Sequence, residues 1–87
     1  MELFSLNAKM LCYLYKNKHK NTFKLDKLSE AVMCNYFKTD NIIMTLGNAK
    51  YIKTSKKDSH NLEYKIELTD KGRHLGKILS KIEKRFH

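Results

Sequence analysis

Apolar and polar residues follow two different periods along the chain, and the changes of period divide it into elements. Near the N-terminus, apolar residues recur at helical spacing in a stripe wider than the roughly 100° that one core-facing helix face needs. We therefore expect a first helix with two neighbours. Its apolar positions are Leu3, Phe4, Leu6, Met10, Leu11, Tyr13, Leu14 and Tyr15.

Two further helical patterns follow a basic polar loop at residues 16–21. Residues 22–25 form a short extended segment, after which Asp26 can cap a helix of about two turns. The apolar face of that helix carries Leu28, Ala31 and Val32. After a tight turn, the next helix has Thr39, Ile43 and Leu46 inward, with Ile42 beside them. Its outward positions are Lys38, Asn41 and Thr45.

From Ile52 the period becomes two, which predicts a β-hairpin: alternation over residues 52–56, a polar turn at 58–61, and a half-buried strand over 62–68. The sequence LTDKG follows directly. Thr69 can cap a last helix by accepting from the amide of Gly72, and Asp70 suits the positive end of the helix dipole. Because Gly costs about 1 kcal/mol against Ala inside a helix, we expect another group to approach Gly72 closely.

The last helix has one apolar and one basic face. Its apolar stripe consists of Leu75, Ile78, Leu79, Ile82 and Phe86. The opposite face carries Lys77, Lys81, Lys84 and Arg85. A stripe of this width, like that of the first helix, exceeds what so small a core can cover.

The order of elements predicts an α+β fold, the winged helix-turn-helix, with a three-helix core, a β-hairpin wing and a C-terminal dimerisation helix. Residues 28–52 resemble the helix-turn-helix core of small winged-helix regulators of the MarR and PadR type. In that pattern an apolar residue opens the second helix, an Ala follows three residues on and a Leu eighteen on, as Leu28, Ala31 and Leu46 do here. The LTDKG segment, residues 68–72, is similar to the L-T-x-K-G with which those regulators commonly leave the wing.

The resemblance covers about residues 5–80 and implies one domain over 1–87, with the helix-turn-helix at about 27–49, the wing at about 51–68 and the C-terminal helix at about 70–86. The chain departs from the family at two positions. Met33 stands where the family usually has Gly in the turn after the second helix, and Lys50 where it tends to have Gly before the first wing strand. Gly47 with Asn48 can instead end the third helix earlier.

The net charge of the chain indicates what kind of partner it binds. Lys and Arg number 18 against 9 Asp and Glu, a net charge of +9 with neutral His, which indicates a polyanion and favours nucleic acid over an anionic membrane. The N-terminal MELFSL lacks a basic signal-peptide region, and no apolar run approaches the ~20 residues of a membrane span, so we expect a cytoplasmic protein.

The resemblance implies a sequence-specific, double-stranded DNA-binding transcriptional regulator. Asn35 would cap the third helix, whose outward residues would face the major groove, and a basic wing would contact the DNA backbone. The implied DNA-binding residues are Tyr36, Phe37, Lys38, Asn41, Thr45, Lys53, Lys56, Lys57 and His60. Tyr36 and Phe37 can equally fill the core or a dimer seam, and Asp40 must point sideways or select cytosine.

We expect a homodimer, because a chain of 87 residues buries only about 60% of its unfolded surface by itself. The first and last helices would form the seam. The expected interface residues are Leu6, Met10, Tyr13, Leu75, Ile78, Leu79, Ile82 and Phe86.

Other functions find less support in the residues. Cys12 and Cys34 are expected to be buried free thiols, with a bridge between them left open, and no Cys/His spacing fits zinc. The four His residues lack a nucleophile or carboxylate partner that the sequence can place, so we expect no enzyme, metal or cofactor. The chief alternative is a winged-helix protein-interaction module. An RNA or single-strand binder would need exposed aromatics among basic residues, for which only Tyr36 and Phe37 qualify.

Overall fold

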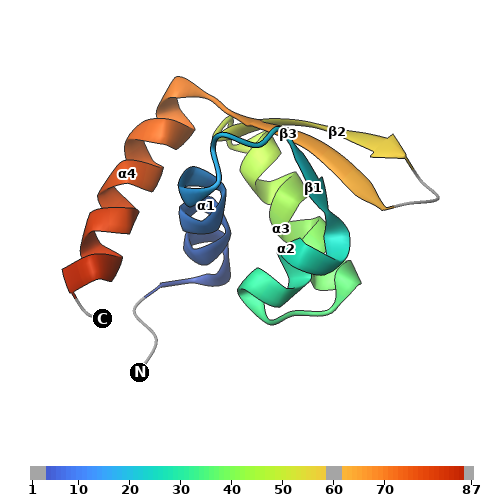
Figure 1. Cartoon of the computed structure of the whole chain (residues 1–87), viewed down its shortest axis with the longest axis horizontal. Coiled ribbons are helices and arrows are strands. Elements are labelled where there is room, and N and C mark those ends of the chain that lie inside the picture. Colours follow the sequence, from blue (N-terminus) through green and yellow to red (C-terminus); the bar gives the residue numbers. More distant parts are fainter. Residues whose placement is uncertain (1–3, 59–61, 86–87) are drawn as a thin grey trace.

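In the residues that the structure describes, the chain forms four helices and a three-stranded sheet (Figure 1). The computed structural model describes residues 4–58 and 62–85, with the side chains of residues 56–58 left out of the description. The elements are α1 (Leu6–Lys16), β1 (Thr22–Lys24), α2 (Leu25–Val32), α3 (Tyr36–Asn48), β2 (Ile52–Asp58), β3 (Glu63–Leu68) and α4 (Asp70–Arg85). The predicted α+β succession is confirmed.

The sheet is antiparallel in the order β1-β3-β2, so β3 is its central strand. Phe23 pairs with Tyr64 on one side of β3, and Ile52 pairs with Leu68 on the other. The sheet lies over one end of the helices, and the β2–β3 hairpin extends past them on the side away from α4 (Figure 1). This hairpin is the wing.

The core lies between α1, α2, α3 and the inner face of the sheet. Its buried residues are Met10, Leu11, Leu14, Phe23, Leu25, Leu28, Val32, Ile42, Ile43, Leu46, Ile52, Tyr64 and Ile66. All four predicted inward residues of α3 are buried, and the three predicted outward residues are exposed. The helical and strand periods of the sequence therefore located the core.

Helix α4 packs along α1 of the same chain, so α1 lies between α4 and the rest of the core (Figure 1). A Cβ at Gly76 would stand 2.7 Å from the Cβ of Tyr15, which shows how closely the two helices approach. Glu83 pairs with Lys16, and the Cys12 thiol donates to the same carboxylate at 3.7 Å. Helix α1 thus packs against α4 on one side and against α2 and α3 on the other, one helix more than the two neighbours expected, and its wide stripe is partly covered within one chain.

Both cysteines are free, which answers the open question of a bridge. Cys12 is buried under α4, and burial raises the pKa of its thiol despite the nearby Lys16. Cys34 is partly exposed and donates to the carbonyl of Val32 at 3.3 Å.

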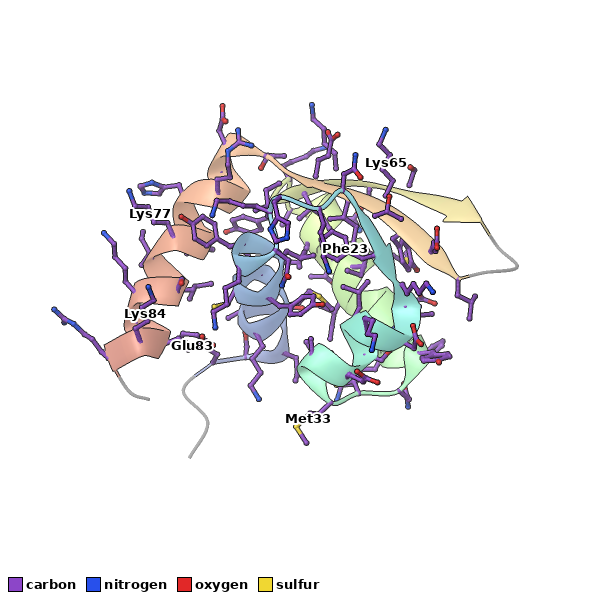
Figure 2. The ribbon with its side chains drawn as sticks, viewed as in Figure 1. Phe23, Met33, Lys65, Lys77, Glu83 and Lys84 are labelled. Carbon is purple, nitrogen blue, oxygen red and sulfur yellow. The ribbon has the colours of Figure 1, made fainter. Side chains whose placement is uncertain are left out.

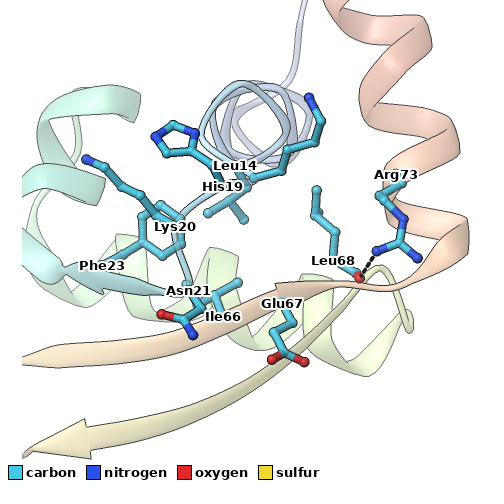
Figure 3. Close-up of a pocket in the computed structure, with 10 residues that line it drawn as sticks. Leu14, His19, Lys20, Asn21, Phe23, Ile66, Glu67, Leu68 and Arg73 are labelled. Carbon is cyan, nitrogen blue, oxygen red and sulfur yellow. Dashed lines mark hydrogen bonds between the residues drawn. The ribbon is translucent and has the colours of Figure 1, made fainter.

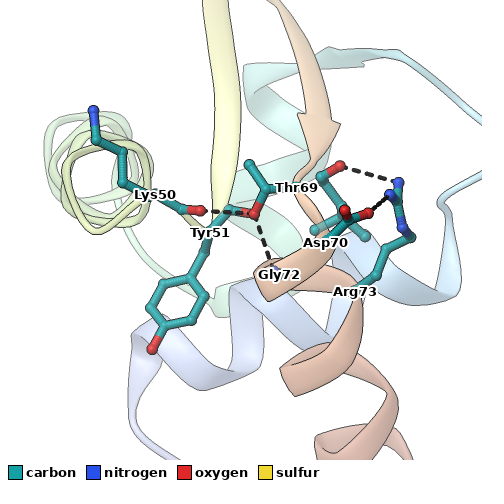
Figure 4. Close-up of polar contacts among 7 residues, drawn as sticks. Lys50, Tyr51, Thr69, Asp70, Gly72 and Arg73 are labelled. Carbon is teal, nitrogen blue, oxygen red and sulfur yellow. Dashed lines mark hydrogen bonds and ion pairs between the residues drawn. The ribbon is translucent and has the colours of Figure 1, made fainter.

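Thr69 ties the start of α4 to the junction between α3 and the wing (Figure 4). Its hydroxyl accepts from the amide of Gly72 at 3.1 Å, as predicted, and donates to the carbonyl of Lys50 at 2.7 Å. Its amide donates to the carbonyl of Tyr51 at 3.1 Å. A side chain at Gly72 would collide with that same carbonyl oxygen, so the predicted close approach is confirmed and comes from backbone.

Two helices end at left-handed residues that are not glycine. Met33 (φ 56°) ends α2, with Met33 N donating to Glu30 O at 3.2 Å and Cys34 N to Ser29 O at 3.1 Å. Lys50 (φ 68°) repeats this pattern after α3, with bonds from Lys50 N to Gly47 O and from Tyr51 N to Leu46 O. Both are Schellman motifs, in which the left-handed position normally favours Gly.

Helix α3 ends at Asn48, in agreement with the expected end at Gly47 with Asn48, although the left-handed residue of the turn is Lys50. The expected start of α2 is wrong: Asp26 does not cap the helix, which begins one residue earlier, at Leu25. The Leu25 amide donates to the carbonyl of Leu62 at 2.8 Å, so the chain passes directly from strand to helix with its first amide satisfied by the wing.

Met33→Gly and Lys50→Gly should each stabilise the fold, because Gly removes the steric cost of the left-handed conformation from an exposed residue. We expect each to raise the free energy of unfolding by about 0.5–1 kcal/mol, measured by urea denaturation. Lys77→Gly, on the exposed face of α4, is the matched control and should lower it by about 1 kcal/mol. Destabilisation by both of the first two changes would contradict the assigned turn geometry.

Candidate nucleic-acid interface

A buried hydrogen-bond chain fixes α3 against α2. Ser29 and Thr39 are both buried, and the Ser29 hydroxyl donates to Thr39 Oγ1 at 3.0 Å. Thr39 Oγ1 in turn donates to the carbonyl of Asn35 at 2.8 Å. Because the buried Ser29 hydroxyl on α2 finds its acceptor on α3, the bond favours this packing of the two helices. The apolar pattern predicted Thr39 inward but gave no signal for Ser29, which lies on a polar position of α2.

Asn35 caps α3, as expected: its side-chain oxygen accepts from the amide of Lys38 at 2.8 Å. The cap residue is exposed, and so are the first three residues of the helix that follows it, Tyr36, Phe37 and Lys38. The remaining orphan amides of this turn are thus close to solvent, where an anion can approach them.

The outer face of α3 carries all five side chains predicted to contact DNA there, and all five are exposed. They are Tyr36, Phe37, Lys38, Asn41 and Thr45. Tyr36 and Phe37 could have filled the core, but they are 48% and 77% exposed.

Sequence reasoning missed Met44, which is 61% exposed. It lies seven residues after Phe37, hence on the same helix face, and this spacing was the available signal. Met33 is 88% exposed and projects away from the body at the turn before α3 (Figure 2).

Asp40 is the one acidic residue of α3, and it points away from this face. Its carboxylate accepts a hydrogen bond from the hydroxyl of Tyr64 on β3. Burial, together with this bond and the negative charge of Asp40, raises the pKa of Tyr64. The sideways alternative for Asp40 is therefore correct, and the outer face of α3 keeps no negative side chain of its own.

The structure describes some of the predicted basic residues of the wing and leaves others undescribed. Lys53 is exposed on β2 and lies opposite Glu67 of β3 in the register. Lys56 lies opposite Tyr64, and the register shifts between Lys56 and Asp58, leaving Lys57 at an irregularity of the strand. The side chains of Lys56 and Lys57 lie outside the description, as does His60 altogether.

The residues predicted to form a dimer seam divide into two groups. Met10 is a correction: it is completely buried in the core of its own chain, since it faces α2 and α3 rather than solvent. Partly buried residues that pack on this core are Leu6, Tyr13, Leu75 and Leu79. On the outer side of α4, a shallow hollow is lined by Ile78, Ile82 and neighbouring basic side chains. Phe86 lies outside the described residues.

A second hollow lies between the end of α1, the following loop, β3 and the start of α4 (Figure 3). Basic side chains on its rim include His19, Lys20 and Arg73, and Arg73 donates to the carbonyl of Leu68 at 3.2 Å. Within residues 4–58 and 62–85, no group of His, Cys, Asp and Glu could hold a metal ion. In the same described part, no helix is both long enough and apolar enough to cross a membrane.

These elements define the winged helix-turn-helix fold: the short helix α2 is bonded to the solvent-facing helix α3, and both lie beside a three-stranded sheet with a projecting hairpin. The sequence matches no protein-family model and no curated protein. Solved structures, in contrast, superpose over nearly the whole chain, so the fold is established by comparison as well as by its elements.

Three of these structures illustrate the range. MepR, a transcription regulator of the Staphylococcus aureus multidrug efflux pump MepA, matches with a TM-score of 0.73 at 19% identity, over 98% of this chain and 61% of MepR. The MarR-family transcriptional regulator SPO1453 from Silicibacter pomeroyi matches at 0.71 and 15%, over 92% of this chain and 54% of that protein. AF1382 from Archaeoglobus fulgidus matches at 0.79 and 20%, over 98% and 92%.

This chain thus spans about three fifths of MepR and about half of SPO1453. A crystal structure of MepR with DNA matches equally well, with a TM-score of 0.73 at 19% identity. At these identities the comparisons show a shared fold, and they agree with the resemblance to MarR-type regulators noted in the sequence.

Burial of Tyr64, together with its bond to Asp40, should make the stability of the fold depend on alkaline pH. The pKa of Tyr64 is raised from its ordinary 10.0, so the folded state keeps a proton that the unfolded chain loses. The contribution is complete below pH ~10 and is lost as pH rises further, at up to about 1.4 kcal/mol per pH unit. Urea denaturation of wild type between pH ~9 and ~11 should show a steeper loss than that of Tyr64→Phe. Parallel curves for the two proteins would disprove the coupling.

Proposed function

We propose that this protein is a sequence-specific, double-stranded DNA-binding transcriptional regulator that acts as a cytoplasmic homodimer without catalytic activity or cofactor. The observation that carries the proposal is the outer face of α3. It is exposed along its length, it has its only acidic residue turned away into a bond with Tyr64, and it belongs to a chain of net charge +9.

In this proposal α3 enters the major groove. The width of that groove admits one helix, and Asn41 is at the centre of the exposed face, where an amide can bond the N6 and N7 positions of adenine. Lys38, in the first turn, can reach a phosphate or guanine. The existence of a DNA complex of MepR, which shares the fold, supports this use of the domain.

The wing would contact the DNA backbone beside the groove. Lys53, Lys56 and Lys57 all belong to β2, and the hairpin projects beyond the helices, so it can extend along the duplex (Figure 1). Acidic residues offset part of this charge, with Glu67 opposite Lys53 and with Asp58 opposite Glu63 toward the tip.

The dimer would form through the outer side of α4. Ile78 is 42% exposed and Ile82 is partly exposed beside it, and these side chains line an apolar hollow on a helix that otherwise shows basic residues to solvent. Pairing of two α4 helices would cover this patch. The dimer would also present two α3 helices to the same side of the DNA. This arrangement favours half-sites about one helical turn apart, ~10 base pairs, or a multiple of it.

A protein-interaction module is the second candidate. Met33, Phe37 and Met44 are exposed apolar residues around the start and outer face of α3, and such residues are enriched in protein interfaces. In that case the basic charge would serve solubility, and mixed-sequence duplex DNA would bind barely, with little dependence on salt.

Single substitutions should separate base contacts from phosphate contacts. Asn41→Ala should weaken binding to a site selected from random duplexes by about 1–3 kcal/mol and relax the preference at one base pair. Lys56→Ala and Lys57→Ala should weaken binding to selected and scrambled sites alike, and each should lower the salt slope by about 1. Fluorescence-anisotropy titrations at several salt concentrations measure both effects.

The matched control for the lysines is Lys77→Ala, because Lys77 projects from α4 on the side away from the wing (Figure 2). It should leave both the slope and the preference unchanged. An unchanged slope in both wing variants would remove the wing from the interface. Intact site preference in Asn41→Ala would remove α3 and favour the protein-interaction module.

Ile82→Glu should separate the dimer, because it introduces a charge into the apolar hollow of α4, whereas Lys77→Glu, on the exposed face of α4 and outside the lining of the hollow, should not. Sedimentation velocity at tens of micromolar should show a monomer for the first variant and a dimer for the second and for wild type. A monomeric wild type would rule out the homodimer, and two dimeric variants would place the seam elsewhere.

A further inference from the structure

The outer face of α3 has an unusual chemistry for a surface that meets a polyanion. Two of its exposed residues, Phe37 and Met44, are large and apolar, and Asn41 lies between them on the same face. The helix (Tyr36–Asn48) contains no arginine, since both arginines of the chain, Arg73 and Arg85, belong to α4. We call Phe37, Asn41 and Met44 the reading line.

The reading line runs parallel to the helix axis. Its spacings of four and three residues place all three side chains on one side of α3. At about 1.5 Å of rise per residue, Phe37 and Met44 are ~10 Å apart along the axis, and Asn41 is near the middle. Base pairs repeat every ~3.4 Å, so the line extends over about three steps.

Thr45, the next exposed residue, adds little hydrogen-bond donation. Its Oγ1 donates to the carbonyl of Asn41 at 2.8 Å, so its proton is already used within the helix. Only its methyl group and the remaining acceptor capacity of the hydroxyl are available to a ligand. Asp40 is bonded to Tyr64, which leaves no carboxylate on the line to accept from cytosine N4.

Each of the four bases presents a different group in the major groove, and the reading line matches two of them. Thymine shows a C5-methyl group, for which an apolar side chain is the partner, and adenine shows the N6 and N7 pair that Asn contacts bidentately. Guanine is contacted best by Arg or Lys, and the one such residue on the outer face of α3 is Lys38, which lies beside the reading line in the first turn and which this inference assigns to a phosphate. The line is therefore complementary to A·T pairs.

We propose that α3 selects A·T base pairs, with Asn41 bonding an adenine and with Phe37 and Met44 contacting thymine methyl groups on either side of it. This inference rests on the proposed function, because it names the base pairs that the DNA-binding face prefers. It also accounts for exposed apolar side chains on a chain of net charge +9: the lysines bind phosphate, and the apolar residues bind the one apolar group of the groove.

The test removes single methyl groups from DNA. Thymines of the site selected by the wild-type protein are replaced one at a time by deoxyuridine, which lacks only the C5-methyl group, and dissociation constants are measured for wild type, Phe37→Ala and Met44→Ala. Both side chains are exposed, so the variants should keep the fold, which circular dichroism checks.

At a contacted thymine, wild-type binding should weaken about fourfold, the equivalent of one buried methyl group. Phe37→Ala should lose this sensitivity at one position and Met44→Ala at another. The control Met33→Ala, in the turn outside the reading line, should keep wild-type sensitivity at both positions.

The outcomes separate this inference from the proposed function. Site-specific binding that is indifferent to every thymine methyl, or a selected site rich in G·C, would overturn the inference and leave the proposed function intact. Absence of any preference among duplexes would overturn both. Tighter binding to the single strand than to the duplex would show that Phe37 stacks on bases, and it would also overturn the inference.

Discussion

The carbonyl group of Tyr51 lies at the junction on which the rest of the structure depends, where the end of α3, the base of the wing and the start of α4 meet. It accepts from the amide of Thr69 at 3.1 Å and shares the Thr69 hydroxyl proton with the closer carbonyl of Lys50. The backbone of Gly72 passes so close to it that no side chain fits between them. The amide of Tyr51 meanwhile closes the last turn of α3 on Leu46. Lys71 lies over the Tyr51 ring and donates to the carbonyl of Ala49, so the end of α3, the base of the wing and the start of α4 meet at one residue.

This constraint gives the two candidate surfaces a defined relation. The outer face of α3 and the wing leave the junction on one side, and α4 leaves it toward α1 (Figure 1). Because α4 is also held along α1 by the close contact of Gly76 with Tyr15 and by the Lys16–Glu83 pair, its direction does not vary freely against α3. A homodimer built on α4 would therefore hold the outer faces of its two α3 helices at one fixed distance from each other, which is what a DNA site with two half-sites needs.

Sequence reasoning succeeded where a local rule and the tertiary contact agree. Thr69 and Gly72 combine a cap with a costly glycine, and the close approach that explains them was predictable. It failed where another segment supplies the partner: Asp26 has cap chemistry, but the wing carbonyl of Leu62 satisfies the first amide of α2. At Met33 and Lys50 the fold imposes left-handed turns on residues that do not favour them, so tertiary packing overrides local preference there.

The same contrast between local pattern and tertiary contact applies to the candidate site. The period of the sequence alone predicts which residues of α3 face outward, whereas the hydrogen bond from Tyr64 to Asp40 depends on a register between α3 and β3 that no local pattern contains. Mapping backbone-amide chemical shifts of the protein with a mixed-sequence duplex, by NMR, would test the whole account most directly. We expect perturbation along α3 and β2, with the basic face of α4 at residues 77–85 unaffected. Perturbation confined to that α4 face would contradict it.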